Sequence, residues 1–188
     1  TLANAVLGYY QRTGQACGVH PVTRLDRDTF GVVLFAKNAY IHEKFCEMQK
    51  KHLISKTYHA SAYGTKMADF GLIDLPILKL PGRSLLRTVA PNGKKCRTLF
   101  AVLARFQDVS VLELKPVTGR THQLRVHCKY AGFPILGDPQ YQSEESEAFS
   151  KENELFSQEL CAKRLEFRHP MTGEKITIYS RQNVWKSP

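Results

Sequence analysis

The sequence lacks features that would place it in a membrane or in an oxidising compartment. None of its apolar runs approaches the roughly 20 residues of a membrane-spanning helix. The first residues, TLANAVLGYY, lack the basic and then apolar segments of a secretory signal peptide. The five cysteines are odd in number, lie far apart and form no CxxC pair. This spacing favours free thiols over zinc ligands or disulfides, and we expect a cytoplasmic protein.

Acidic residues are missing from one long stretch, between Asp74 and Asp108. The basic residues of that stretch are Lys79, Arg83, Arg87, Lys94, Lys95, Arg97 and Arg105. The whole chain of 188 residues has 27 Lys and Arg against 17 Asp and Glu, a net charge of +10 with His neutral. A surface of one sign attracts a polyanion, so nucleic acid is the expected partner; a solvated basic face without a ligand is the alternative. Residues 144–159 contain six Glu and one Lys, and we expect them to face away from phosphates.

Apolar periodicity predicts an α+β fold. Helices are expected over residues 2–12, 39–51 and 121–131, the last with Thr121 as its N-cap. Strands are expected over residues 31–36, 57–63, 98–106, 109–116, 163–168 and 175–180. Residues 70–95, with three Pro and three Gly, are expected to be mostly loop. Because strands outnumber helices and two of them form a hairpin, the sheet should be largely antiparallel.

Two aspartates stand among arginines in VTRLDRDTFG (residues 22–31), directly before the apolar run GVVLFA. The string Asp26-Arg27-Asp28-Thr29 is similar to the nucleophile motif of haloacid-dehalogenase-type phosphatases. Those enzymes place the motif at the end of an apolar strand and use magnesium. Here the preceding residues, HPVTRL, are not an apolar strand, and the later acidic pair Gly137-Asp138 is a weak match to a metal motif. The phosphatase interpretation is therefore disfavoured.

A second motif, LKPVTGRTHQLRVH (residues 114–127), predicts a turn followed by a basic helix. His122 and Arg125 are three residues apart and would share a face of that helix. Arg120 precedes the N-terminus of the helix, where free amide groups favour an anion. A carboxylate placed against Arg125 would stay ionised. From spacing alone, a catalytic helix and a helix that binds the RNA backbone or braces the fold fit equally well.

In order along the chain, these motifs resemble the RluA family of RNA pseudouridine synthases. RLDRDT followed by Gly31 resembles the catalytic loop of that family, and LKPVTGRTHQLRVH with GFPILGDPQY resembles its second long motif. Lys56-Thr57-Tyr58 is similar to a K-x-Y element, and LCA with LEFRHPMTG is similar to the closing strands. Three residues differ from those that many members carry: Thr23 in place of His, Phe30 in place of Ser, and Cys161 in place of His.

The resemblance implies that residues 1–188 form one catalytic domain, a mixed and largely antiparallel sheet flanked by helices with a cleft across it. It also implies that the first strand of the family, with its Lys-Pro element, and an S4-type RNA-binding domain are absent. The implied activity is isomerisation of specific uridines in structured ribosomal or transfer RNA to pseudouridine. No metal, no cofactor and no obligate protein partner are expected, and the expected state is a monomer.

The resemblance also assigns roles to single residues. Asp26 matches the catalytic aspartate, which attacks or stabilises the anomeric carbon of the sugar or assists proton removal beside it. Arg125 matches the arginine that pairs with this acid, and Tyr58 the tyrosine that packs on the target base. The alternatives are a phosphate contact for Arg125 and a strand core position for Tyr58. Arg24 matches the residue that fills the space of an extruded base, whose unstacking costs on the order of a few kcal/mol.

Four more residues are expected to contact RNA: Arg120, His122, Gln123 and Lys56. The first three fit equally well as caps or braces of the helix, and Lys56 as an ordinary exposed strand lysine. We expect Asp138 to brace a turn and Asp28 to bind its own loop or Arg27. A catalytically inactive RNA-binding module with the same fold remains as the alternative function, and the presence of Asp26, Tyr58 and Arg125 together favours the enzyme.

Overall fold

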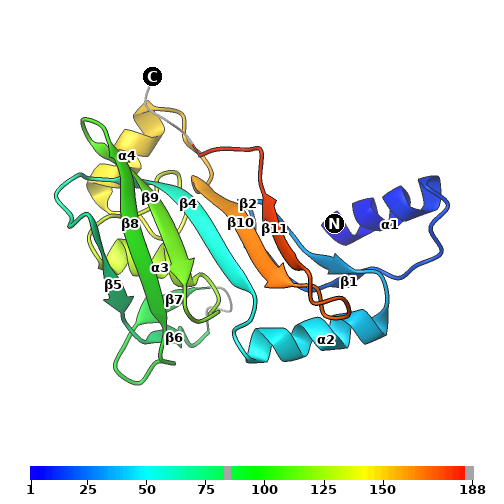
Figure 1. Cartoon of the computed structure of the whole chain (residues 1–188). Coiled ribbons are helices and arrows are strands. Elements are labelled where there is room, and N and C mark those ends of the chain that lie inside the picture. Colours follow the sequence, from blue (N-terminus) through cyan, green and yellow to red (C-terminus); the bar gives the residue numbers. More distant parts are fainter. Residues whose placement is uncertain (83–85, 185–188) are drawn as a thin grey trace.

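The computed structural model describes residues 1–82 and 86–184, so the predicted basic residue Arg83 lies outside it (Figure 1). The helices are α1 (Leu2–Arg12), α2 (Ala39–Lys50), α3 (Gln123–Tyr130) and α4 (Glu144–Glu152). The strands are β1 (His20–Pro21), β2 (Phe30–Gly31), β3 (Phe35–Ala36), β4 (Ser55–Tyr63), β5 (Phe70–Asp74), β6 (Ile77–Lys79), β7 (Arg87–Val89), β8 (Arg97–Arg105), β9 (Val109–Pro116), β10 (Leu160–Arg168) and β11 (Lys175–Tyr179). Among the helices of these residues, none has the length and apolar character needed to cross a membrane.

A mixed sheet lies at the centre of the described chain. Its strands follow the order β11-β10-β4-β9-β8-β5, and all of these neighbours are antiparallel. The short strand β2 adds to β10 in parallel. β8 and β9 form the predicted hairpin, in which the backbone N–H of Phe106 donates to the carbonyl of Val109. The prediction of an α+β fold with a largely antiparallel sheet is confirmed.

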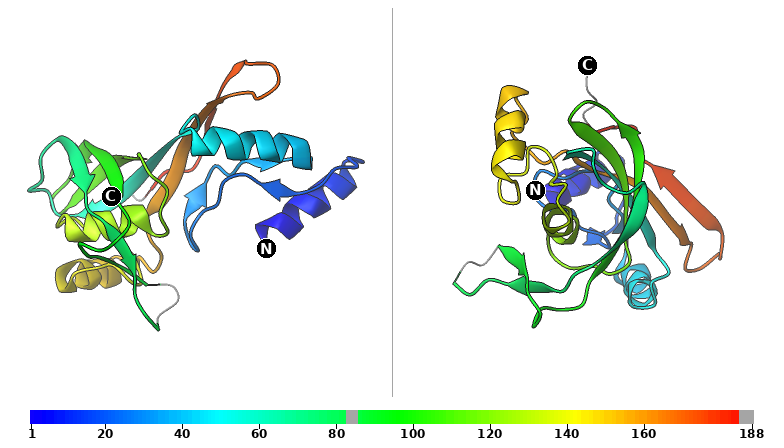
Figure 2. Two further views of the ribbon diagram at one scale, coloured as in Figure 1. Left: turned by 90° about the horizontal axis from the view of Figure 1, so that it is seen from below. Right: turned by 90° about the vertical axis from the view of Figure 1, so that its left-hand side faces the viewer.

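Two hydrophobic cores, the largest among the described residues, lie along this sheet. In the larger core, Ala60, Leu112 and Leu114 of β4 and β9 pack against Leu124 and Cys128 of α3. Figure 2 shows β5, β8 and β9 curving around α3. The smaller core packs residues of α2 against the far half of β10, and it contains Val22, Ala36, Phe45, Leu165 and Phe167. β4 and β10 run between the two halves of the described chain (Figure 1).

The prediction of one strand over residues 31–36 was wrong. β2 pairs with β10, whereas β3 pairs with β1, so the apolar run changes partner in its middle. The cause lies at Gly31, where φ is +114° and the chain cannot continue as a regular strand. The structure also differs from expectation in residues 70–95, at α4 and at the start of α3.

The expected loop over residues 70–95 contains three short strands that were not predicted, because β5 pairs with β8, and β6 with β7. The prolines of this stretch stand between the strands rather than within them. α4 was not expected; it begins with a capping box in which Ser143 and Ser146 bond each other's backbone, and glutamates occupy its first turn. The helix at 121–131 begins later than expected. Its N-cap is His122 rather than Thr121, with φ at +57°.

Gly31 offers a direct test of how the loop that precedes it is anchored. A Cβ at this position would lie 2.4 Å from the carbonyl oxygen of Ala162 and 2.7 Å from its nitrogen. We expect Gly31→Ala to lower the free energy of unfolding by about 1–3 kcal/mol, measured by urea denaturation, and to reduce activity. Gly14→Ala is the matched control, because φ is +66° there and nothing lies within 4 Å of the added Cβ. Equal losses of unfolding free energy in the two variants would show that close packing against β10 is not the reason that position 31 requires glycine.

Candidate active site

The loop that carries Asp26 is fixed at both ends by hydrogen bonds. The hydroxyl of Thr23 accepts from the backbone N–H of Leu34 at 2.9 Å. At the other end, the buried side chain of Gln158 donates to the carbonyl of Arg27 and to the hydroxyl of Thr29. Gln158, which no sequence motif indicated, stands in an irregular segment before β10. Its contact with the loop depends on the fold alone.

Strand β10 places this loop beside Tyr58. Ala162 of β10 pairs with Gly31 on one side and with Tyr58 of β4 on the other. Burial, and after it the negative charge of Asp26, raises the pKa of Tyr58 to about 12. The phenol is therefore neutral at physiological pH and keeps its proton. Tyr58 also packs against the larger core, so its side chain combines a strand core position with a place on the cleft wall.

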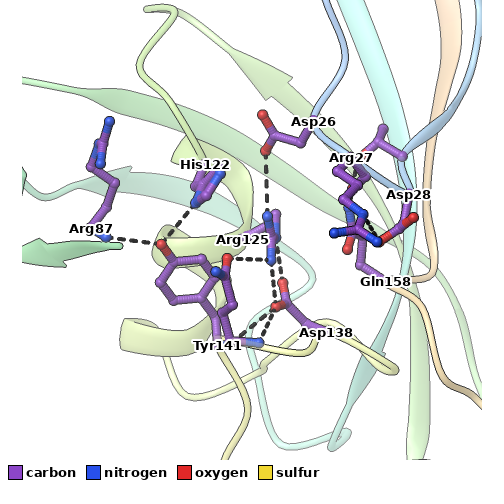
Figure 3. A network of polar contacts seen from close by, with 11 residues as sticks. Asp26, Arg27, Asp28, Arg87, His122, Arg125, Asp138, Tyr141 and Gln158 are labelled. Atoms are coloured by element: carbon purple, nitrogen blue, oxygen red, sulfur yellow. Dashed lines mark hydrogen bonds and ion pairs between the residues drawn. The ribbon is translucent and has the colours of Figure 1, made fainter. Parts of the chain in front are cut away.

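Arg125 of α3 lies against the loop that carries Asp26, and its side chain is only 4% exposed. Its guanidinium nitrogen Nη1 lies 3.8 Å from Oδ2 of Asp26. Two other nitrogens donate to both oxygens of the fully buried Asp138, at 2.6 and 2.8 Å. Nη2 also donates to Oε1 of Gln140 at 3.0 Å. Figure 3 shows that Arg125 lies between the two carboxylates.

Asp138 therefore does more than the turn-bracing predicted for it. It does brace the turn, because Oδ1 accepts from the backbone N–H groups of Gln140 and Tyr141 at 2.9 and 3.1 Å. It also holds Arg125 in a bidentate pair. Burial by itself would lower the pKa of Arg125, but the hydrogen bonds and charge of Asp138, assisted by Asp26, raise it. Arg125 is therefore a fixed cation beside Asp26.

These side chains stand at or behind the wall of one cleft, with a volume of about 660 Å³. Its walls come from the Asp26 loop, α2, the start of β4 and the segment before α3. Seven of the eight predicted site residues line it: Arg24, Asp26, Lys56, Tyr58, Arg120, His122 and Gln123. Arg125, the eighth, is buried against Asp26. Sites of this size commonly take small organic ligands, and a nucleotide falls within that class.

Comparison with known proteins decides the family of this chain. Residues 3–130 match the family model described as RNA pseudouridylate synthase. The chain belongs to this family. It is 37% identical over 180 residues to the uncharacterized RNA pseudouridine synthase YjbO of Bacillus subtilis (strain 168), covering 96% of this chain and 61% of that protein. It is 34% identical over 166 residues to ribosomal large subunit pseudouridine synthase C of Vibrio cholerae, covering 88% of this chain and 52% of that protein.

Among solved structures, the human RNA pseudouridylate synthase domain containing 1 is similar to this chain with a TM-score of 0.74 and 26% identity. That match covers 90% of this chain and 77% of the human chain. The sequence resemblance to RNA pseudouridine synthases and the fold expected from it are thus confirmed. The chain spans 61% and 52% of the two bacterial relatives, so it corresponds to little more than half of each.

Within this cleft, Gln123 is placed differently from the other predicted RNA contacts. It is buried, and its amide nitrogen donates to the carbonyl of Arg97 and the hydroxyl of Thr98. Its amide oxygen accepts from the hydroxyl of Thr118 and the backbone N–H of Arg120. This placement favours the bracing role for Gln123. Its contacts fasten the segment before α3 to β8.

The remaining predicted contacts are open to the cleft to different degrees. Arg24 and Arg120 are exposed, and Lys56 is half-buried on the cleft wall, where burial lowers the pKa of its ammonium group. Asp28 lies outside this group, with an ion pair of 3.7 Å to Arg27, as expected. Within the described residues, no group of three or more His, Cys, Asp or Glu is arranged to hold a metal ion.

Proposed function

We propose that this chain is the catalytic part of an enzyme that isomerises uridine to pseudouridine in structured RNA. The observation that carries the proposal is the placement of Asp26, at a cleft wall, 3.8 Å from the buried cation Arg125 and next to Tyr58. Members of one family can lose catalysis, but this arrangement retains an acid, a fixed cation and an aromatic ring around one cleft. Those are the groups that the reaction requires.

In the proposed reaction, the bond between N1 of uracil and C1′ of ribose breaks, and the base turns within the cleft. C5 then bonds to C1′, the hydrogen of C5 leaves as a proton, and N1 gains a proton. The carboxylate of Asp26 acts at C1′ or at the proton beside it, and both routes need the acid aimed at the sugar. Arg125 supplies positive charge at the acid, while Asp138 prevents the guanidinium from turning away.

Tyr58 and the exposed cations of the cleft are proposed to hold the substrate. The ring of Tyr58 offers an aromatic face for the detached base, in keeping with its neutral phenol. Arg24 is exposed at the mouth of the cleft and has the planar guanidinium that can stack in the space left by an extruded nucleotide. Several relatives are named for the large ribosomal subunit, among them synthase C of Vibrio cholerae, so we propose ribosomal RNA as the first substrate to test.

The experiment is the release of tritium from RNA that carries uridine tritiated at C5. The RNA is taken from cells that lack the gene, so that its target positions are still uridine. We expect the purified protein to release tritium, because C5 loses its hydrogen when it bonds to the ribose. Tight RNA binding without release from ribosomal or transfer RNA would support the inactive RNA-binding module instead.

A further inference from the structure

Tyr141, which the sequence analysis did not single out, joins four parts of the site. It is 3% exposed, and its hydroxyl accepts from the backbone N–H of Arg87 at 2.9 Å. The same hydroxyl lies 2.9 Å from Nδ1 of His122. The guanidinium of Arg125 stands over its ring, 5.0 Å from the centroid. Its backbone N–H donates to Asp138. Figure 3 shows this side chain between β7 and the start of α3.

The hydroxyl of Tyr141 has one hydrogen, and its partners determine where that hydrogen points. The N–H of Arg87 can only donate, so the hydroxyl oxygen must accept there. Among the described residues, Nδ1 of His122 is the other hydrogen-bond partner of this hydroxyl. If Nδ1 carried a hydrogen, the buried O–H would have no acceptor, which is unfavourable. The hydroxyl therefore donates to Nδ1, and a neutral His122 carries its hydrogen on Nε2.

The other ring nitrogen of His122 is available to a ligand. His122 lines the cleft, and in the described part of the chain Nε2 has no hydrogen-bond partner. Burial lowers the pKa of His122; Arg125 and Arg87 act in the same direction, and Asp26 and Asp138 oppose them. The ring is therefore neutral at physiological pH and does not compete with Arg125 for the carboxylate of Asp26. The positive φ of His122, +57°, is a costly backbone conformation of the kind found at functional sites.

We propose that Tyr141 is a positioning residue that holds His122 as its Nε2–H tautomer, and that His122 donates this hydrogen to an acceptor oxygen of the nucleotide beside Asp26. The proposal rests on the proposed function, because that function supplies the nucleotide. The acceptor is a carbonyl oxygen of the uracil or an oxygen of the sugar-phosphate backbone. Either oxygen can accept a hydrogen bond from a neutral donor at the cleft wall.

The tautomer is measured without any activity, by nitrogen NMR of protein labelled with ¹⁵N in its histidine rings. His122→Gln identifies the signals of His122 among the seven histidines. We expect the Nε2–H tautomer in the native protein, and a mixture of both tautomers in Tyr141→Phe, which keeps the ring beneath Arg125. A native Nδ1–H tautomer, or the same tautomer in Tyr141→Phe, would overturn the positioning role. This readout stands even if the protein proves to have no synthase activity.

The acceptor is identified by titrating the same labelled protein with two probes. A short oligouridylate should shift the Nε2–H signal of His122. An abasic oligonucleotide of equal length tests the source: a shift with both probes assigns a backbone oxygen, and a shift with oligouridylate alone assigns the uracil. If neither probe moves this signal while the signals of His42 or His52, which also line the cleft, respond, His122 is not a donor to the nucleotide.

A matched pair of variants tests the contribution to catalysis. His122→Gln keeps an N–H donor at nearly the same reach, and His122→Leu removes it, while both carry the same cost of positive φ. In the tritium assay we expect kcat/KM to fall by about tenfold in His122→Leu, the size of one neutral hydrogen bond, and to stay within about threefold in His122→Gln. Equal losses in the two variants would contradict a donor role.

Discussion

Asp26→Asn is expected to reduce tritium release by at least about 1,000-fold, because it removes the carboxylate that acts on the sugar and replaces it with a neutral amide of the same shape. RNA affinity should stay within a few-fold, since the expected binding cations are unchanged. Stability should change by less than about 1 kcal/mol, because Asp26 is partly exposed and Arg125 keeps its bidentate partner. Filter binding and urea denaturation measure these two quantities.

Asp28→Asn is the control for that experiment. It removes a carboxylate two positions away, whose ion-pair partner is the exposed Arg27. We expect this variant to keep nearly all of its activity. Retained turnover in Asp26→Asn would remove Asp26 from its proposed role. Equal loss in both variants would point instead to the charge of the loop as a whole.

Arg125→Met is expected to lower the free energy of unfolding by about 3–5 kcal/mol and to abolish turnover. The reason for the first effect is Asp138, which would remain fully buried without its cation. The second effect follows because Asp26 would lose the positive charge that stands 3.8 Å from its carboxylate. Urea denaturation and tritium release measure the two losses separately.

The double variant Arg125→Met with Asp138→Asn separates stability from catalysis. The asparagine keeps an oxygen for the backbone N–H groups of Gln140 and Tyr141, and it no longer needs a counterion. We expect most of the lost stability to return, with turnover still absent. If turnover returned as well, the role of Arg125 would be limited to neutralising Asp138. Wild-type stability in Arg125→Met alone would show that the buried pair contributes little.

Much of the fold could be predicted because the decisive signals are local. The apolar spacing of α1 and α2 lies within each helix, and the turn between β8 and β9 lies within one hairpin. The errors fall where neighbours in space decide the structure. Gly31 divides an apolar run because β10 lies against it, and β5 is a strand because β8 offers it an edge.

The site residues also divide into those that local motifs indicate and those that only the fold brings together. Sequence motifs indicated Asp26, Tyr58 and Arg125 as candidates, and the fold places Asp26 beside each of the other two. The bidentate pair of Arg125 with Asp138 was missed, because a buried charge and its partner are defined by burial rather than by spacing. Gln158 and Tyr141 were also missed. Each makes a hydrogen bond with a residue far away in the sequence, Arg27 for the first and Arg87 for the second.

The place of β10 has one more consequence. Ala162 pairs with Gly31 of β2, the strand that follows Asp26, and also with Tyr58 of β4. β2 and β4 therefore cannot separate without breaking backbone hydrogen bonds of the sheet. The loop that carries Asp26 and the strand that carries Tyr58 are thus held together by the sheet, and under the proposed function we expect the deformation needed for protein and RNA to meet to come from the RNA. Uridines that leave their stack cheaply should be modified first, and local melting of the RNA should set the order in which positions react.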